Sequence, residues 1–232
     1  MLDKDIIKSK FQKSILTYPK YASIQLEIAK KLADFIDCDY QNILEIGSYS
    51  GFLTNEIVKK IYFKSYTALD IIDSFDCIKN LSPKIKFILD DVENIEFSEK
   101  YDLIVSSSSL QWCNDFKSVI KKLKSSLNDN GRIMLAIFGN KNLFQIKEIF
   151  NISLDYPSLS DIRKMFSSNA IIEEEIKTIQ FDSPYDILRH LKYTGVNSFK
   201  NNYTYSKFKE GLKVLENKFE NKLTYNPLYI ID

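Results

Sequence analysis

Acidic or small polar residues end four short apolar segments of the chain, in positions where they could bind a nucleoside. Glu45 and Gly47 lie at the end of the first segment, Asp70 at the second, Asp91 at the third, and serines 106–109 at the fourth. One carboxylate can accept hydrogen bonds from two vicinal hydroxyls, so Asp70 suits a ribose. Asp70 also follows Gly47 at close to the roughly 20-residue spacing typical of a ribose-binding carboxylate.

The loop between Gly47 and Gly51 does not fit a dinucleotide or a nucleoside triphosphate. The dinucleotide fingerprint G-x-G-x-x-G lets the backbone approach a pyrophosphate. Here Tyr49 stands between the two glycines, and no Gly-Lys-Ser/Thr follows. Glu45 beside the loop would repel a phosphate but attract an ammonium group. The pattern therefore favours a cationic nucleoside.

Alternating helices and strands must position these residues. Apolar residues recur at helical spacing in some segments, and short apolar runs lie between them. Helices are predicted over 21–36, 51–61 and 116–127, and strands over 42–46, 66–71, 84–90, 101–109 and 132–138, the last entered by a turn at Asn130-Gly131. This alternation predicts a parallel sheet with helices on both faces. The carboxyl ends of its strands, near the topological switch point, are where such sheets bind ligands.

The alternation loosens after Gly139. Residues 159–168 and 206–219 have helical spacing, and Pro184 and Gly195 mark the start and the end of another helix. The segment 170–181 has strand-like alternation. A closing strand is expected over 223–231, where Pro227 argues for a sheet edge or a bulge. We expect one domain decorated by helices.

Composition excludes several other classes of function. The 32 basic and 31 acidic residues nearly cancel, so no basic excess points to nucleic acid. A single histidine, His190, excludes a His-pair metal site, and no metal is expected. Cys38, Cys77 and Cys113 lie far apart and predict neither a metal site nor a disulfide framework. The chain lacks a signal-peptide pattern and any apolar run of roughly 18 residues, so a cytoplasmic protein that does not act at membranes is expected.

The segments "LEIGSYSG", "ALDI", "LDDVE", "YDLIVSSSSLQW" and "NGRIMLAIF" resemble, in this order, the class I S-adenosylmethionine-dependent methyltransferases. The resemblance covers roughly residues 40–140. It implies a Rossmann-like α/β fold with a mostly parallel seven-stranded sheet flanked by helices. Gly47, Ser48 and Gly51 would surround the methionine end and Glu45 its amino group. Asp70 would bind the ribose, and Asp91 with the Val92 amide the adenine. The full set of predicted cofactor contacts is Gln25, Glu45, Gly47, Ser48, Tyr49, Gly51, Asp70, Ile71, Asp91, Val92, Ser106 and Ser107.

The outer segments are similar to one subfamily, the malonyl-[acyl-carrier protein] O-methyltransferases of biotin synthesis. These segments are "FQKSILTYPKYASIQLEIAKKL", "SLQWCND", "LRHLKYTGVN" and "LTYNPLYII". The resemblance implies an N-terminal helical lid (1–38), a cofactor-binding core (39–140), and substrate-side helices and final strands (141–232), with a helical insertion before the last strand. It also implies a malonyl thioester on acyl carrier protein as substrate. We expect the enzyme to act as a monomer.

Two positions depart from the family pattern. A glycine is usual where this chain has Tyr49, and an asparagine is common where it has Ser107. A β-carbon at position 49 would crowd the cofactor unless the loop takes a negative φ and the ring turns outward. With that geometry the loop remains a cofactor site.

Methyl transfer to a carboxylate is an in-line displacement that needs no general base. The nucleophile is already ionised, since its unperturbed pKa is about 4, and the protein must align the reactants and exclude water. Of the three arginines, Arg189 is the predicted carboxylate clamp. Tyr18 and Tyr21 of the lid are predicted to close over the substrate, and Gln111 and Trp112 to contact it.

Two alternatives remain open. The enzyme could methylate a free small acid such as trans-aconitate, which would require more than one cationic anchor. Alternatively, the chain could be a cofactor-binding subunit that has lost catalysis and acts as a partner or regulator. Tyr49 and Ser107 are the sequence support for that reading.

Overall fold

A seven-stranded sheet forms the centre of the computed structural model, which describes residues 2–196 and 204–232. The strand order is β3-β2-β1-β4-β5-β9-β6, and β9 pairs in the antiparallel sense with both of its neighbours. The predicted mostly parallel seven-stranded sheet is confirmed. The strands are β1 Tyr40–Ile46, β2 Phe63–Asp70, β3 Ile85–Leu89, β4 Tyr101–Ser107, β5 Leu127–Phe138, β6 Ile171–Glu174 and β9 Pro227–Ile231, and β7 Lys177–Gln180 pairs with β8 Lys222–Tyr225 in a second sheet.

Helices cover both faces of the sheet because neighbouring strand residues point to opposite sides. Ile43 and Leu103 pack in one core cluster with α3 (Ser23–Asp34) and α4 (Phe52–Lys60). Leu44 and Ile104 pack in the other, with α6 (Phe116–Ser125) and α8 (Leu159–Met165). These parallel strands are therefore continuously apolar, as expected of a sheet buried on both faces.

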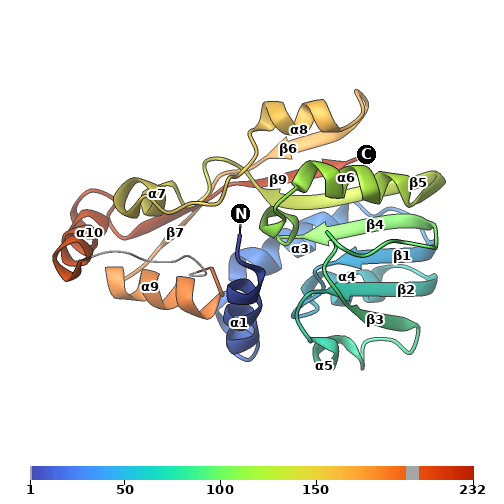
Figure 1. Ribbon diagram of the computed structural model, residues 1–232, viewed down its shortest axis with the longest axis horizontal. Helices are drawn as coiled ribbons and strands as arrows, with labels where there is room; N and C mark the ends of the chain where they lie inside the picture. The colour runs from blue at the N-terminus through green and yellow to red at the C-terminus, as the bar shows by residue number, and fades with distance from the viewer. Residues whose placement is uncertain (1, 197–203) are drawn as a thin grey trace.

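The remaining helices lie beyond the carboxyl ends of the strands. Figure 1 shows α1 (Lys4–Ser14) standing beside these ends, with α7 (Phe144–Phe150), α9 (Pro184–Tyr193) and α10 (Tyr205–Asn217) grouped on its far side. The short helices α2 (Tyr18–Tyr21), α5 (Phe75–Ile78) and η1 (Leu110–Trp112) complete the described secondary structure. None of the helices in the described ranges has the length and apolar character needed to span a bilayer.

The turn predicted at Asn130-Gly131 is wrong, because both residues lie inside β5. The register between β4 and β5 shifts there: Tyr101 pairs with Leu127, but Leu103 pairs with Arg132. The extra residues form a bulge in β5. A β-carbon on Gly131 would lie 2.7 Å from the Tyr101 carbonyl oxygen, so the close approach of β4 requires glycine.

Two strand predictions in the last third are also corrected. The segment 170–181 divides into β6 and β7, which belong to different sheets. The closing segment divides likewise into β8 and β9, and β9 lies between β5 and β6 instead of at an edge. Pro227 is tolerated there because it is the first residue of β9, a position where the ladder does not depend on its missing N–H.

Candidate active site

A cavity opens where β1, β2 and β4 end, next to α1 and α2. Its volume is about 660 Å³ including the space at its mouth. Ile7 and Phe11 of α1 form part of the wall. The residues predicted from sequence that line it are Tyr18, Gln25, Glu45, Gly47, Ser48, Tyr49, Asp70, Ile71, Ser107 and Trp112. The sheet topology thus brings together most of the predicted site, since parallel strands end at one edge.

The turn after β1 depends on Gly47. This residue has φ +78, a region that glycine adopts at little cost, and its amide donates to the Leu69 carbonyl at 2.7 Å. A β-carbon at position 47 would collide with the side chain of Ser109. Gly51, with φ +75, is the N-cap residue of α4 and does not line the cavity. Both glycines are therefore needed by the loop geometry itself.

Tyr49 contradicts the predicted loop geometry. Its φ is +33 and its ring is buried, whereas a negative φ and an outward ring were expected. Its amide donates to Asp70 Oδ2 at 2.8 Å and its hydroxyl to the Phe11 carbonyl at 2.7 Å. The ring meets Phe11 and Tyr18 edge-on, with centroids 5.4 and 4.8 Å away. These contacts offset the cost of a left-handed tyrosine and join the loop to the lid.

Asp70 is held with both carboxylate oxygens facing backbone amides. Oδ2 accepts from Tyr49 N and Oδ1 from Ile72 N, each at 2.8 Å. The side chain is buried, and burial raises the pKa of this carboxyl to about 6 despite these hydrogen bonds. Each oxygen keeps a second lone pair, so the fixed carboxylate can still accept from two hydroxyls.

Glu45 lies deeper in the cavity and is 1% exposed. Its Oε2 accepts from Thr54 Oγ1 at 2.6 Å and from the Tyr66 hydroxyl at 2.7 Å. Burial raises its pKa to about 7, although both hydrogen bonds act in the opposite direction. A cationic ligand group near Glu45 would therefore meet a carboxyl that ionises close to neutral pH.

Asp91 and Val92 line an adjoining recess that also contains Gly47, Asp70 and Trp112. Lys4, the first residue of α1, reaches into the same recess. Its ammonium lies 3.3 Å from Asp91 Oδ2 and 2.6 Å from Glu93 Oε2. The segment around α1 thus contacts the loops at the strand ends through Lys4 here and through Tyr49 at the glycine loop.

A second, smaller cavity of about 350 Å³ adjoins the first behind Trp112. The two cavities share Phe11, Tyr18, Gln25, Ser108 and Trp112. The other wall residues of the second cavity are Gln111, Phe138, Asn142, Leu143, Tyr156, Thr194, Val196 and Tyr225. The described residues of this wall include no Asp, Glu, Lys, Arg or His, so the second cavity is polar without being charged.

Five buried polar atoms on these walls have no hydrogen-bond partner among the described residues. They are Gln25 Oε1, Ser48 Oγ, Ser107 Oγ, Ser108 Oγ and Gln111 Oε1. Buried polar atoms are normally paired, because leaving one unpaired costs about 1–3 kcal/mol. Their concentration around the two cavities indicates a site built for a polar ligand, and it fits a nucleoside cofactor with an amino-acid end.

Comparison with known proteins decides the family. A family model described as "Methyltransferase domain" matches residues 19–200. A malonyl-[acyl-carrier protein] O-methyltransferase of Calditerrivibrio nitroreducens is 32% identical, covering 97% of this chain and 94% of its own. One from Haemophilus influenzae is 31% identical, covering 99% and 94%. The chain belongs to the malonyl-[acyl-carrier protein] O-methyltransferase family.

Solved structures agree on the fold. A methyltransferase from Bacillus halodurans aligns with a TM-score of 0.63 at 13% identity, covering 89% of this chain and 96% of that one. The YcgJ protein of Bacillus subtilis aligns with a TM-score of 0.62 at 14% identity. The predicted class I methyltransferase fold is confirmed, and this protein is an S-adenosylmethionine-dependent O-methyltransferase.

Four predicted contact residues of this methyltransferase lie outside the cavity walls, namely Gly51, Ser106, Tyr21 and Arg189. Ser106 is buried in β4, where its hydroxyl donates to the Ile46 carbonyl at 2.8 Å. Tyr21 packs on Tyr193 with ring centroids 4.6 Å apart. Arg189 is 56% exposed and pairs with Asp186 one helical turn away at 2.9 Å. The structure therefore does not place Arg189 where it could clamp a substrate carboxylate.

Sequence reasoning missed several wall residues of the methyltransferase. Lys4 lies outside the family-like segments, and Phe11 begins one of them without any spacing that distinguishes it, whereas Ser108 belongs to the serines 106–109 that end the fourth apolar segment. Tyr156 and Tyr225 come from the loosely patterned last third of the chain, and only folding brings them beside Gln25. For these residues the sequence carries no periodic signal.

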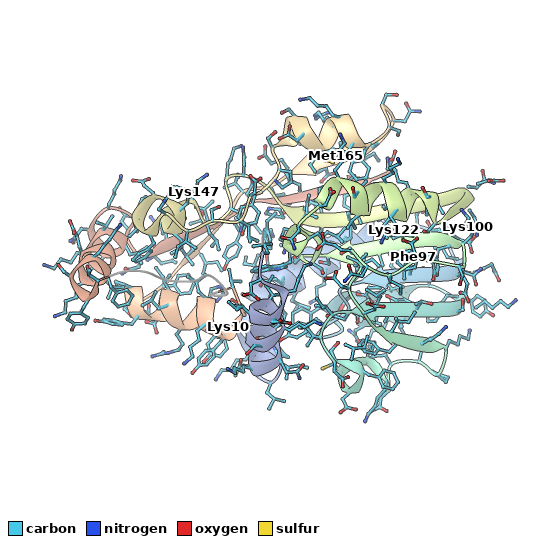
Figure 2. The ribbon with its side chains drawn as sticks, viewed as in Figure 1. Lys10, Phe97, Lys100, Lys122, Lys147 and Met165 are labelled. Atoms are coloured by element: carbon cyan, nitrogen blue, oxygen red, sulfur yellow. The ribbon has the colours of Figure 1, made fainter. Side chains whose placement is uncertain are left out.

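Lys122 of α6 supports the loop that follows β3. Figure 2 labels Lys122 among the side chains drawn on the ribbon. Its ammonium donates to the carbonyls of Val92, Glu93 and Ile95 at 3.2, 3.0 and 2.8 Å. It therefore supports the loop that carries the predicted adenine contacts. The ammonium of Lys124 similarly donates to Asp232 and to the Met165 carbonyl, so both lysines connect α6 to other elements of the fold.

Proposed function

We propose that this methyltransferase methylates the free carboxylate of a malonyl thioester carried on acyl carrier protein, an early step of biotin synthesis. The observation that carries the proposal is the pair of joined cavities. One contains the fixed carboxylates expected of a nucleoside site, and the other is polar but uncharged. The acceptor is taken from the relatives that match over nearly their full length, which are malonyl-[acyl-carrier protein] O-methyltransferases.

The first cavity would hold S-adenosylmethionine. Asp70 would accept from the ribose hydroxyls, and Glu45 would face the ammonium group. Gly47, Ser48 and Ser107 would surround the methionine end, with Gln25 between the two cavities. Asp91 and the Val92 amide would meet the adenine in the adjoining recess, where Lys4 is their neighbour. The bound cofactor supplies an electrophilic methyl group on a positively charged sulfur.

The protein's own contribution is positioning and the exclusion of water. Phe11, Tyr18 and Trp112 lie on the walls common to both cavities. Their apolar rings would strip water from an incoming carboxylate, which makes it a better nucleophile. The carboxylate is ionised at neutral pH and needs no base, so alignment accounts for most of the barrier reduction.

The uncharged second cavity argues against a free polyacid such as trans-aconitate. Each additional carboxylate would be buried without a cation among the described wall residues, which is costly. A malonyl thioester brings one carboxylate only.

We further propose that residues 1–232 act as one monomeric, cytoplasmic methyltransferase unit, which sedimentation analysis and the activity of the whole chain would test.

Methyl transfer from labelled S-adenosylmethionine tests the proposal. The acceptors are malonyl-acyl carrier protein, malonyl-coenzyme A, trans-aconitate and buffer alone. We expect a base-labile label on malonyl-carrier protein. Faster transfer to malonyl-coenzyme A would identify coenzyme A as the acyl carrier. Faster transfer to trans-aconitate would identify a free small acid as the substrate. Cofactor binding without transfer to any acid would indicate a subunit that has lost catalysis.

A further inference from the structure

Tyr225 and His190 form a buried hydrogen-bonded pair behind the second cavity. The His190 Nε2 atom lies 2.6 Å from the Tyr225 hydroxyl, and the two side chains are 5% and 1% exposed. Tyr225 ends β8 and lines the cavity wall, whereas His190 comes from α9. Phe181 packs on the imidazole with ring centroids 5.2 Å apart, which fixes its orientation.

We propose that the Tyr225 hydroxyl anchors the acceptor carboxylate in the second cavity, and that His190 is the residue that positions it. This inference rests on the proposed function and replaces Arg189 as the carboxylate anchor. His190 Nε2–H donates to the Tyr225 oxygen, so that the phenol proton points into the cavity. Tyr225 is therefore a donor toward the carboxylate and an acceptor toward His190.

The protonation states of the pair agree with this geometry. Burial lowers the pKa of His190 to about 4, so its ring is neutral near pH 7 and carries one N–H and one lone pair. Burial raises the pKa of Tyr225, so the phenol keeps its proton. The pair is therefore uncharged, and it presents the Tyr225 hydroxyl as a hydrogen-bond donor with a fixed direction.

A neutral donor suits this reaction better than an arginine would. As the methyl group moves, the negative charge of the carboxylate and the positive charge on the cofactor sulfur cancel. A cation bound to the carboxylate would stabilise the charged reactants more than the transition state, which raises the barrier. A single neutral hydrogen bond replaces part of the lost hydration and holds the oxygen in place.

Tyr225→Phe tests the anchor, with Tyr229→Phe as the matched control. Tyr229 is equally buried, but its hydroxyl donates to Glu175 at 3.3 Å. For Tyr225→Phe we expect kcat/KM for malonyl-acyl carrier protein to fall roughly 10- to 100-fold, as for loss of a hydrogen bond to a charged group. The Kd for S-adenosylhomocysteine should stay within about twofold of wild type, and Tyr229→Phe should keep its kcat/KM within about threefold. Equal kcat/KM for the two variants would overturn the proposal.

His190→Gln and His190→Leu test the positioning role. Glutamine retains an N–H near the place of Nε2, so it should recover much of the kcat/KM that leucine loses. His190→Leu should cost nothing further in a Tyr225→Phe background, because the two residues act as one unit. Additive losses in the double variant would overturn the positioning role.

The single histidine of the chain gives an independent readout. Long-range ¹H–¹⁵N spectra of the complex with S-adenosylhomocysteine and malonyl-acyl carrier protein should show the Nε2–H tautomer. An Nε2 without a proton would overturn the arrangement. If the wild type transfers no methyl to malonyl-carrier protein, the proposed function fails separately. The anchor is then judged by titration with malonate, and unchanged His190 resonances would overturn it.

Discussion

The hydroxyl of Tyr49 in the glycine loop donates to the carbonyl of Phe11 in the lid helix at 2.7 Å. The same residue's amide donates to Asp70, so one side chain and its backbone connect the lid, the loop and the predicted ribose carboxylate. A position where the family usually has glycine is thus a connection to the lid in this chain. We infer that opening of α1 is coupled to this loop.

Tyr49→Phe should loosen the lid without unfolding the enzyme. The Ser14 hydroxyl also donates to the Phe11 carbonyl, at 3.1 Å, so that acceptor stays paired. We expect the free energy of unfolding to fall by about 1 kcal/mol. Amide hydrogen exchange within α1 should become faster while β1 and β4 remain protected. Unchanged exchange in α1 would contradict the proposed coupling.

Lys4→Met should weaken the other end of the lid. Lys4 separates two carboxylates, those of Asp91 and Glu93, which would repel each other once the ammonium is removed. We expect about 1 kcal/mol of lost stability in urea unfolding at low salt, and a smaller loss at 1 M salt. Lys8→Met, an exposed substitution on the same helix, is the matched control and should be nearly neutral. An equal loss in both variants would exclude this ion pair as the cause.

Binding of S-adenosylhomocysteine, the product formed from the cofactor, should release a proton from Glu45 near pH 7. Because burial raises its folded-state pKa to about 7, the carboxyl is about half protonated there, whereas in the unfolded chain it is ionised. Burial of Glu45 therefore costs stability as pH rises from about 4.5 to 7, and a bound ammonium group would favour the ionised form. Calorimetry of S-adenosylhomocysteine binding in buffers of different ionisation enthalpy should show about half a proton released. Glu45→Gln should release less, and equal release would refute this role.

Gly47→Ala should destabilise the fold through a specific collision with Ser109 as well as through its positive φ. We expect a loss of roughly 2–4 kcal/mol, of which about 1 kcal/mol belongs to the backbone conformation. Gly47→Ala combined with Ser109→Gly removes the collision. The double variant should therefore recover most of the stability that the single variant loses to the collision. If chemical denaturation shows no recovery, the Ser109 contact is not the cause.

Arg189→Ala should leave catalysis almost intact. The guanidinium is 56% exposed, and its pairing with Asp186 is a surface interaction worth about 0–1 kcal/mol. We expect kcat at saturating malonyl-acyl carrier protein to stay within about twofold of wild type. A loss of two orders of magnitude would restore Arg189 as the carboxylate clamp.

The parallel strands β1 to β4 and the position of the glycine loop could be predicted because their signals are local, but the conformation of Tyr49 within that loop could not. The apolar runs around Leu44 and Ile104 indicated buried parallel strands, and Asp70 lies at the strand end where the spacing placed it. The interior place of β9 could not be predicted, since strand order depends on pairing between distant segments. Its proline pointed to an edge or a bulge, but Pro227 is the first residue of the strand and breaks no ladder bond.

By itself, the sequence determined the parallel part of the sheet, the position of the loop after β1 and the carboxylates at the strand ends. All of these follow from short-range periodicity and from the rule that parallel strands end together. Only the tertiary structure decided the acceptor side. Tyr225 and His190 meet at 2.6 Å from separate elements, and Arg189, one residue before His190, points to solvent. On a helix, neighbouring residues face different directions, so chain position alone could not choose between them.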